Sequence, residues 1–256
     1  MSDTFGTGDM PKRKADGVAD AINNILKNLV IKCSRPEGVR EYYHVGVIGY
    51  GATVGPALGG AHSGKELISI KEIADNTSRL EEREKMVEDG AGGIIKQKVK
   101  FPIWLDPVAN NGTPMCQAAE MAHKLLSDRL AKHPDCFPPT VIHITDGEST
   151  DGDPIQALQK LTHLSSSDGN VLLFNLHLSS NPNALPTSFP CSSSQLPDQY
   201  ARMLFDTASE LTPFMRSVAS ELGVNLADGA KGFVLNADLV LVIQALDIGT
   251  RPANLR

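Results

Sequence analysis

The stretch Val141–Gly147, with the sequence VIHITDG, decides the fold. Four of its first five residues are β-branched, which predicts a buried strand over Val141–Thr145. Asp146 and Gly147 follow that strand directly. In an open parallel sheet, ligands bind just beyond the carboxyl ends of the strands. A carboxylate at such a position is costly unless it is solvated, paired or bound to a cation. Asp146 is therefore a candidate ligand-binding residue.

The rest of the chain alternates between helical and extended patterns. Helices are expected at Lys12–Ile31, from Pro114 to before Pro134, from Asp153-Pro154 onward, at Thr212–Leu222 and at Ala237–Leu246. Further strands are expected at Val45–Tyr50, Val171–Leu176 and Gly232–Leu235. This alternation predicts an α/β fold, doubly wound, with a mostly parallel sheet that is covered on both faces.

One domain spanning residues 1–256 accommodates these elements, with an insertion at about 51–105. The insertion begins as a glycine-rich stretch and becomes strongly charged at Arg79–Lys85. Within it, short strands are expected at Leu67–Ile70 and Val99–Leu105. The segment Gly59–Glu66 resembles a phosphate-binding loop, but Glu66 stands where that loop needs a hydroxyl for magnesium, which argues against nucleotide binding.

Composition excludes several classes of function. With 24 basic and 30 acidic residues, the net charge of −6 gives no electrostatic case for binding nucleic acid or an anionic membrane. The four cysteines lie far apart without any Cys-x-x-Cys pair, as expected for reduced thiols. No run approaches 18 apolar residues, and the first residues are polar. We therefore expect a cytoplasmic protein without a membrane span or signal peptide.

A second polar position lies in the loop Asn111–Pro114, with the sequence NGTP. Pro114 suits the first position of a helix, and Thr113 before it suits the capping position. The Thr113 hydroxyl is also placed to reach a ligand. Taken singly, Thr113 and Asp146 are explained by a helix cap and a turn. Their order along the chain favours a shared ligand site.

These residues resemble parts of a von Willebrand factor type A (vWA) domain of the intracellular bacterial type. Such domains carry a metal-ion-dependent adhesion site (MIDAS) made from three loops: Asp-x-Ser-x-Ser after the first strand, a Thr in the second loop, and an Asp, often before Gly, after the fourth strand. Thr113 matches the second element and Asp146 the third. The blocks Gly169–His177 and Asn236–Pro252 are similar to later parts of such proteins, so the resemblance covers essentially the whole chain.

The first element of that pattern is absent from the sequence. In related proteins Met often follows Asp-x-Ser-Gly-Ser, so we hypothesise that Met1 is that methionine and that the first, central strand is missing from this chain. The resemblance then implies unpaired backbone groups on the two strands that would flank it. It also implies that only Thr113 and Asp146 remain to bind metal, whereas magnesium takes six oxygen ligands.

The function that the resemblance implies is not enzymatic. In an intact family member, Mg²⁺ or Mn²⁺ at this site binds a protein partner whose acidic side chain completes the coordination. The partner's identity is open. The alternative is a metal-dependent hydrolase that uses Asp146 with the neighbouring carboxylates of Glu148, Asp151 and Asp153. Because Asp153-Pro154 suits a helix cap and no nucleophile or general base stands out, the binding function is favoured.

Overall fold

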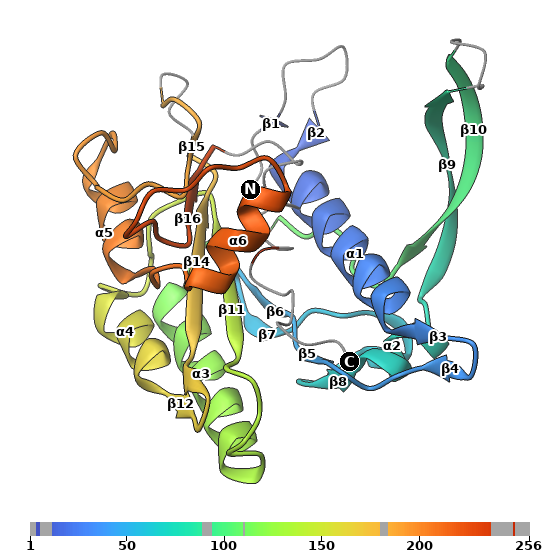
Figure 1. Cartoon of the computed structure of the whole chain (residues 1–256), viewed down its shortest axis with the longest axis horizontal. Coiled ribbons are helices and arrows are strands. Elements are labelled where there is room, and N and C mark those ends of the chain that lie inside the picture. Colours follow the sequence, from blue (N-terminus) through green and yellow to red (C-terminus); the bar gives the residue numbers. More distant parts are fainter. Residues whose placement is uncertain are drawn as a thin grey trace. The chain divides into compact units, whose positions relative to one another are not determined.

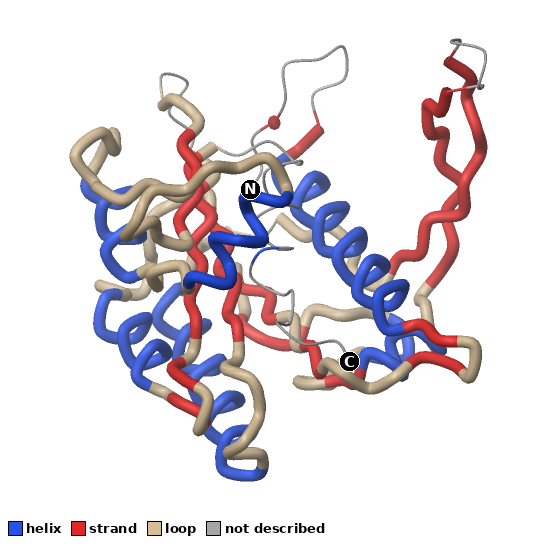
Figure 2. Tube along the Cα trace, in the orientation of Figure 1, coloured by secondary structure: helices blue, strands red, loops and turns tan. Residues whose placement is uncertain are grey.

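A computed structural model describes residues 4–5, 12–88, 94–109, 111–179, 184–236 and 248. The chain divides into two compact units (Figures 1 and 2). The first unit comprises residues 1–21, 48–55 and 108–256, and the second comprises 22–47 and 56–107. The helix α1 (Lys14–Cys33) begins in the first unit and continues into the second, close to the expected bounds Lys12–Ile31.

The first unit contains a four-stranded sheet. Its strands, in spatial order, are β11 (Thr140–Thr145), β14 (Leu172–His177), β16 (Phe233–Leu235) and β15 (Thr187–Ser188). The first three run parallel, and β15 pairs antiparallel with β16. The chain is therefore an α/β protein with a mixed, mainly parallel sheet, and the three strands predicted in this unit are confirmed.

Strand β14 lies in the interior of the sheet, and all its residues after Leu172 are buried. Because side chains alternate between the two faces of a strand, such continuous burial means that both faces are covered. The buried Asn175 has its polar atoms satisfied. Its amide nitrogen donates to Leu204 O at 2.7 Å and to Thr207 Oγ1 at 3.1 Å, and its oxygen lies 2.9 Å from His143 Nδ1. His143 of β11 is thus hydrogen-bonded within the sheet.

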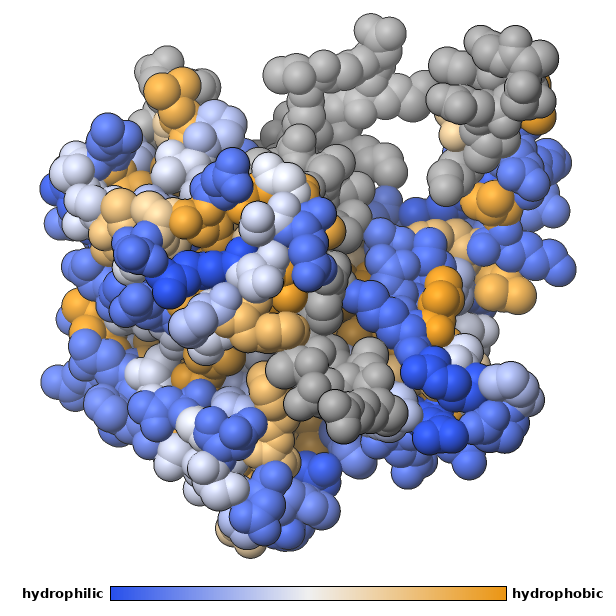
Figure 3. All heavy atoms as spheres, in the orientation of Figure 1, coloured by the Kyte–Doolittle hydropathy of each residue, from blue (hydrophilic) through white to orange (hydrophobic). Residues whose placement is uncertain are grey.

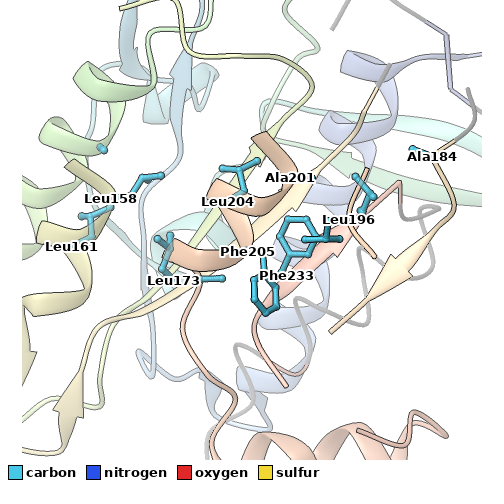
Figure 4. Close-up of a cluster of buried hydrophobic side chains, with 12 residues drawn as sticks. Leu158, Leu161, Leu173, Ala184, Leu196, Ala201, Leu204, Phe205 and Phe233 are labelled. Atoms are coloured by element: carbon cyan, nitrogen blue, oxygen red, sulfur yellow. The ribbon is translucent and has the colours of Figure 1, made fainter. Parts of the chain in front are cut away.

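Four helices accompany the sheet. They are α3 (Met115–Lys132), α4 (Ile155–His163), α5 (Gln199–Thr207) and α6 (Pro213–Glu221). Helices α4 and α5 contact β14, and α3 packs on α4. Apolar side chains from α3, α4, α5, the sheet and adjoining loops form one cluster (Figure 4), with members Ala119, Leu158, Leu161, Leu173, Ala184, Leu196, Ala201, Leu204, Phe205, Ala208, Phe233 and Leu235. Burying each large member stabilises the fold by roughly 1.5–3 kcal/mol, so this cluster contributes substantially to the stability of the unit.

Side-chain caps define where several helices begin. The Thr212 hydroxyl accepts from Met215 N at 3.2 Å and precedes Pro213, so α6 begins where the sequence predicts. Asp153 accepts from Ile155 N at 3.0 Å, which confirms the expected cap of α4. Asp198 accepts from Ala201 N at 2.8 Å and starts α5, a helix that the sequence analysis missed.

The second unit is built from most of α1, short antiparallel pairs, two further helical segments and one long antiparallel pair. Its elements after α1 are β3 (Ser34–Arg35), β4 (Gly38–Val39), β5 (His44–Val45), η1 (Gly60–His62), β8 (Ile68–Ser69), α2 (Ile70–Asp75), β9 (Arg79–Glu88) and β10 (Ile94–Ile103). The buried Asn23 ties α1 to the end of β10. Its oxygen accepts from the backbone N–H groups of Trp104 (2.8 Å) and Leu105 (3.0 Å), and its amide donates to Leu105 O at 2.8 Å.

Strands β9 and β10 form a two-stranded ribbon, ten residues in each strand (Figure 2). Its surface mixes charged and apolar side chains (Figure 3). Lys96 Nζ pairs with Glu84 across the strands at 3.0 Å, and the Arg83 guanidinium stacks over the Phe101 ring, 3.9 Å from its centroid. Large exposed apolar residues on the ribbon are Leu80, Met86 and Ile95. Strand β10 contains most of the strand predicted at Val99–Leu105. It begins earlier in the chain, at Ile94, and ends at Ile103.

The prediction of one buried strand at Val45–Tyr50 is wrong. Strand β5 ends at Val45, and β6 (Ile48–Tyr50) instead forms a hairpin with β7 (Val54–Pro56). The turn closes with Gly51 N donating to Thr53 O at 3.1 Å. Gly46 and Gly49, on either side of Val47-Ile48, interrupt the β-branched run, so the chain can turn back before a long strand forms.

Other expectations have mixed outcomes. The strand expected at Leu67–Ile70 is reduced to two residues, because the Ser69 hydroxyl accepts from Glu72 N at 3.2 Å and starts α2 at Ile70. The expected helix at Ala237–Leu246 lies outside the described residues. Four short strands complete the described elements: β1 (Thr4–Phe5), β2 (Lys12–Arg13), β12 (Ser165–Ser166) and β13 (Gly169–Asn170). Among the described helices, none has the length and apolar character to cross a membrane.

Candidate functional site

The carboxyl ends of three parallel strands meet in register at one edge of the sheet. Thr145 of β11 is paired with His177 of β14, which is paired with Leu235 of β16. Two backbone hydrogen bonds continue the ladder past these residues: Leu178 N donates to Thr145 O, and Asn236 N donates to His177 O, each at 2.8 Å. The residue after each strand, Asp146 for β11, therefore lies at the position where open α/β sheets bind ligands.

The loop before α3 is fastened to the loop after β11. Thr113 N donates to Thr150 Oγ1 at 2.9 Å, and Thr150 N donates to Thr113 O at 3.0 Å. A Cβ atom built on Gly147 would lie 3.6 Å from Thr113 Oγ1. The structure thus brings the Thr113 hydroxyl beside the residue that directly follows Asp146. The two positions predicted as metal ligands are on adjoining loops.

The expectation that Thr113 caps the following helix is wrong. Helix α3 begins at Met115 and receives no side-chain cap from its own N-cap residue, Pro114. Asp151, from the loop after β11, caps it instead by accepting from Cys116 N at 3.1 Å and Gln117 N at 2.9 Å. Because the cap comes from another loop, the Thr113 hydroxyl is left available to face the edge of the sheet.

The Asp151 carboxylate is a structural anchor rather than a solvated loop residue. It is half-buried and also accepts from the Ser149 hydroxyl at 2.9 Å. Burial alone would raise its pKa, but the backbone hydrogen bonds from Gln117 and Cys116, together with the Ser149 hydroxyl, lower the pKa below its ordinary value. A carboxylate held at the start of a helix also gains from the helix dipole. Asp151 is thus kept ionised and unavailable to a metal.

Charged groups from three other segments surround His177. Burial lowers the pKa of His177, the carboxylates of Asp198 and Asp146 oppose that effect, and the ammonium of Lys14 reinforces it. Lys14 is buried, and its Nζ donates to Leu178 O at 2.9 Å. His177 is also buried, and its Nδ1 has no hydrogen-bond partner among the described residues. The Nδ1 atom of His177 is therefore a buried polar atom, at the carboxyl end of β14, that the described residues do not satisfy.

Tyr50 approaches the same end of β11 from the hairpin β6–β7. Its hydroxyl donates to Ile144 O at 2.6 Å, and its ring centroid lies 5.8 Å from that of His143. Burial raises the pKa of Tyr50 far above its ordinary value, and the negative charge of Asp146 raises it further. Tyr50 therefore stays a neutral hydrogen-bond donor at the edge of the sheet.

The remaining acidic residues of this region do not converge on Asp146 as a hydrolytic site would require. Glu148 is exposed and hydrogen-bonded to Tyr200, whose pKa it raises. Asp151 and Asp153 are used as helix caps. In the part of the chain that the structure describes, no three His, Cys, Asp or Glu side chains gather closely enough to hold a metal ion. The arrangement gives no support to the hydrolase alternative.

The two predicted metal ligands fit a hard cation in chemistry but not in number. A threonine hydroxyl and an aspartate carboxylate are oxygen ligands of the kind that Mg²⁺ takes. Glycine at position 147 leaves the space beside the Thr113 hydroxyl open. Six ligands are needed, so most positions would be filled by water and by oxygens from elsewhere. Thr113 and Asp146 thus suit part of a magnesium site.

Sequence reasoning missed Lys14, Asp198 and the role of Asp151 in this region. Asp198 had a usable signal, because an Asp before an amphipathic segment is a typical helix start. Lys14 ends the short basic run Lys12–Lys14, and such runs are usually solvated. Only the fold shows that the side chain of Lys14 is buried. No local pattern shows that Asp151 caps a helix more than thirty residues earlier.

Comparisons of the chain with models of protein families, with curated proteins and with solved structures gave no match.

Proposed function

We propose that this protein is a non-enzymatic protein-interaction module of the vWA type, whose ligand site is the edge of the sheet at Thr113 and Asp146. One observation supports it most: the loops that carry these two residues are locked together by the reciprocal Thr113–Thr150 hydrogen bonds at the carboxyl end of parallel strands. An enzyme needs a nucleophile or general base beside its ligand, and two of the carboxylates nearby, Asp151 and Asp153, are used as caps.

The proposed ligand is an acidic side chain of a protein partner, bridged by Mg²⁺ or Mn²⁺. Thr113 and Asp146 would hold the cation, which supplies a positive charge for the partner's carboxylate. The chain's own role is to orient the two oxygens, since Asp151 and Thr150 fix their loops. With two protein ligands, binding of the metal alone is expected to be weak, and a carboxylate that joins the coordination is expected to strengthen it.

Mn²⁺ binding, followed by its paramagnetic effect on water proton relaxation, tests this proposal. Acetate serves as the stand-in for the partner's carboxylate. The expected result is weak Mn²⁺ binding that acetate tightens and that Thr113→Val and Asp146→Asn both abolish. Matched controls are Thr162→Val, whose hydroxyl bonds within α4 at 2.9 Å, and Asp153→Asn, from the same loop. Binding that survives in both site variants, or that the controls remove equally, would refute the assigned site.

A further inference from the structure

Asn111 and Gly112 form the only Asn-Gly pair in the sequence. Both residues are exposed, and both lie in the loop before α3. The side-chain amide carbon of an asparagine is an electrophile, and the backbone nitrogen of the next residue can attack it to close a five-membered ring. A side chain on that next residue hinders the approach, and glycine has none. The pair therefore has the local chemistry that ring closure needs.

The two reacting groups are not engaged elsewhere in the part of the chain that the structure describes. There, the Gly112 N–H has no hydrogen-bond acceptor, and the Asn111 side chain has no partner. The loop is anchored one residue later, where Thr113 N donates to Thr150 Oγ1 at 2.9 Å. Ring closure at Asn111 thus breaks no hydrogen bond that the described residues make.

The shape of the loop requires glycine at position 112. Gly112 has φ +96°, a backbone conformation that L side chains rarely adopt. A Cβ atom built there would also lie 3.4 Å from Gly51 O, in the hairpin β6–β7. The fold therefore places after Asn111 the one residue whose backbone nitrogen is not shielded by a side chain.

Asn76 provides a comparison within the same chain. It is exposed, as Asn111 is, but its amide donates to Glu72 O at 3.1 Å, and Thr77 follows it. Because threonine is β-branched, its side chain crowds the backbone around it. Asn76 therefore combines an occupied amide with a hindered neighbour, whereas Asn111 has neither.

We propose that Asn111 is a modification site, at which the chain deamidates spontaneously and gains a carboxylate that strengthens cation binding at the candidate site. Gly112 N attacks Asn111 Cγ, so that a new N–C bond forms and the Cγ–Nδ2 bond breaks. The amide leaves as ammonia, together with the Gly112 proton. Water then opens the succinimide ring: addition at Cγ gives aspartate, and addition at the backbone carbonyl carbon gives isoaspartate. Water is the co-reactant, and no oxidant or reductant is needed.

Either product adds a negative charge close to the candidate cation site. Two peptide units separate Asn111 from Thr113, so their Cα atoms lie within about 7.6 Å of each other. Thr113 and Asp146 supply only part of the six oxygen ligands that magnesium takes. A unit charge at about this distance, even in water, raises the affinity for a divalent cation by about fivefold. This second step rests on the proposed function, whereas the deamidation itself does not.

The first test compares the complete, folded chain with a synthetic peptide of residues 108–117, both kept at pH 8 in ¹⁸O-labelled water. Mass spectrometry of the digested chain measures the conversion of the Asn111 amide to an acid that contains one labelled oxygen. We expect Asn111 to convert at a rate similar to that in the peptide, while Asn76 keeps its amide. The proposal is overturned if the folded chain keeps the Asn111 amide when the peptide has lost it, or if Asn76 converts as fast.

The second test measures Mn²⁺ binding to Asn111→Asp through water proton relaxation. Binding about fivefold tighter than in the original chain is expected. The matched variant Asn111→Gln keeps a neutral amide and should bind like the original chain. Equal or weaker binding by Asn111→Asp overturns the second step. If Thr113→Val and Asp146→Asn leave Mn²⁺ binding unchanged, the proposed function fails and the second step fails with it, while the mass measurement still decides the deamidation.

Discussion

The cap of α3 gives the sharpest prediction about stability. Replacing Asp151 by Ala removes one carboxylate that accepts from two backbone N–H groups, at 3.1 Å and 2.9 Å, and from the Ser149 hydroxyl at 2.9 Å. A lost N-cap costs typically about 1 kcal/mol, and hydrogen bonds to a charged group contribute about 1.5–3 kcal/mol. We expect Asp151→Ala to lower the free energy of unfolding by about 2 kcal/mol at pH 7.

Asp153 provides the matched comparison. It lies in the same loop, is exposed, and accepts from one backbone N–H, that of Ile155 at 3.0 Å. Asp153→Ala should therefore cost about 1 kcal/mol or less. Both substitutions replace Asp by Ala. The difference between their effects on the free energy of unfolding therefore measures the contribution of the second hydrogen bond and of the link between the two loops.

The effect of Asp151 should also depend on pH. Its pKa is lower in the folded protein than in the unfolded chain, so the unfolded state binds the proton more readily. The contribution is therefore complete above the unfolded pKa and is lost as the pH falls through the folded pKa. Urea unfolding, followed by circular dichroism at pH 7 and at successively lower pH, measures how much the substitution lowers the free energy of unfolding at each pH. The reasoning is refuted if Asp151→Ala lowers the free energy of unfolding by less than about 0.5 kcal/mol at pH 7. It is also refuted if the effect of the substitution is unchanged at a pH below the folded pKa of Asp151.

Two further predictions concern the buried polar residues of β14. Asn175→Leu removes the amide that donates to Leu204 O and to the Thr207 hydroxyl. It should therefore lower the free energy of unfolding by about 2–4 kcal/mol, measured by chemical unfolding. A decrease of less than about 1 kcal/mol would contradict the role of these hydrogen bonds. Burial lowers the pKa of His177 in the folded state, so acidification from pH 7 through the unfolded pKa protonates the unfolded chain first and reduces stability. In His177→Gln the free energy of unfolding should change less between pH 7 and pH 5 than in the original chain. An unchanged slope would show that His177 does not cause this pH dependence.

Part of the fold was predictable because some segments carry their own structural information. Val141–Thr145 and Val171–Leu176 are nearly continuous apolar runs, and such runs are stable mainly as buried strands. Thr212 with Pro213 is a complete helix start in two residues. In these places the local preference and the tertiary environment agree, so the sequence alone was sufficient.

Other parts depend on partners far away in the chain. Val45–Tyr50 has strand-forming residues, but its glycines permit two short antiparallel pieces, and the choice between one strand and two is made by what each can pair with. Of the candidate site, Thr113 and Asp146 could be placed on adjoining loops from the order of the elements. The burial of Lys14 and the long-range cap by Asp151 could not, since both arise only when separate segments meet.

The ribbon β9–β10 has a consequence for how the chain can vary in length. Its strands are paired residue by residue, from Arg79 opposite Ile103 to Glu88 opposite Ile94. Removing one residue from each strand at opposing positions shortens such a ribbon, and removing two from each keeps every remaining side chain on its original face. Near the end of the ribbon that joins the rest of the second unit, the Lys27 ammonium of α1 lies over the Phe101 ring, and Asn23 of α1 accepts from Trp104 N. The outer part of the ribbon is thus a segment whose length can change by paired insertions or deletions while the packing of the rest of the chain is conserved.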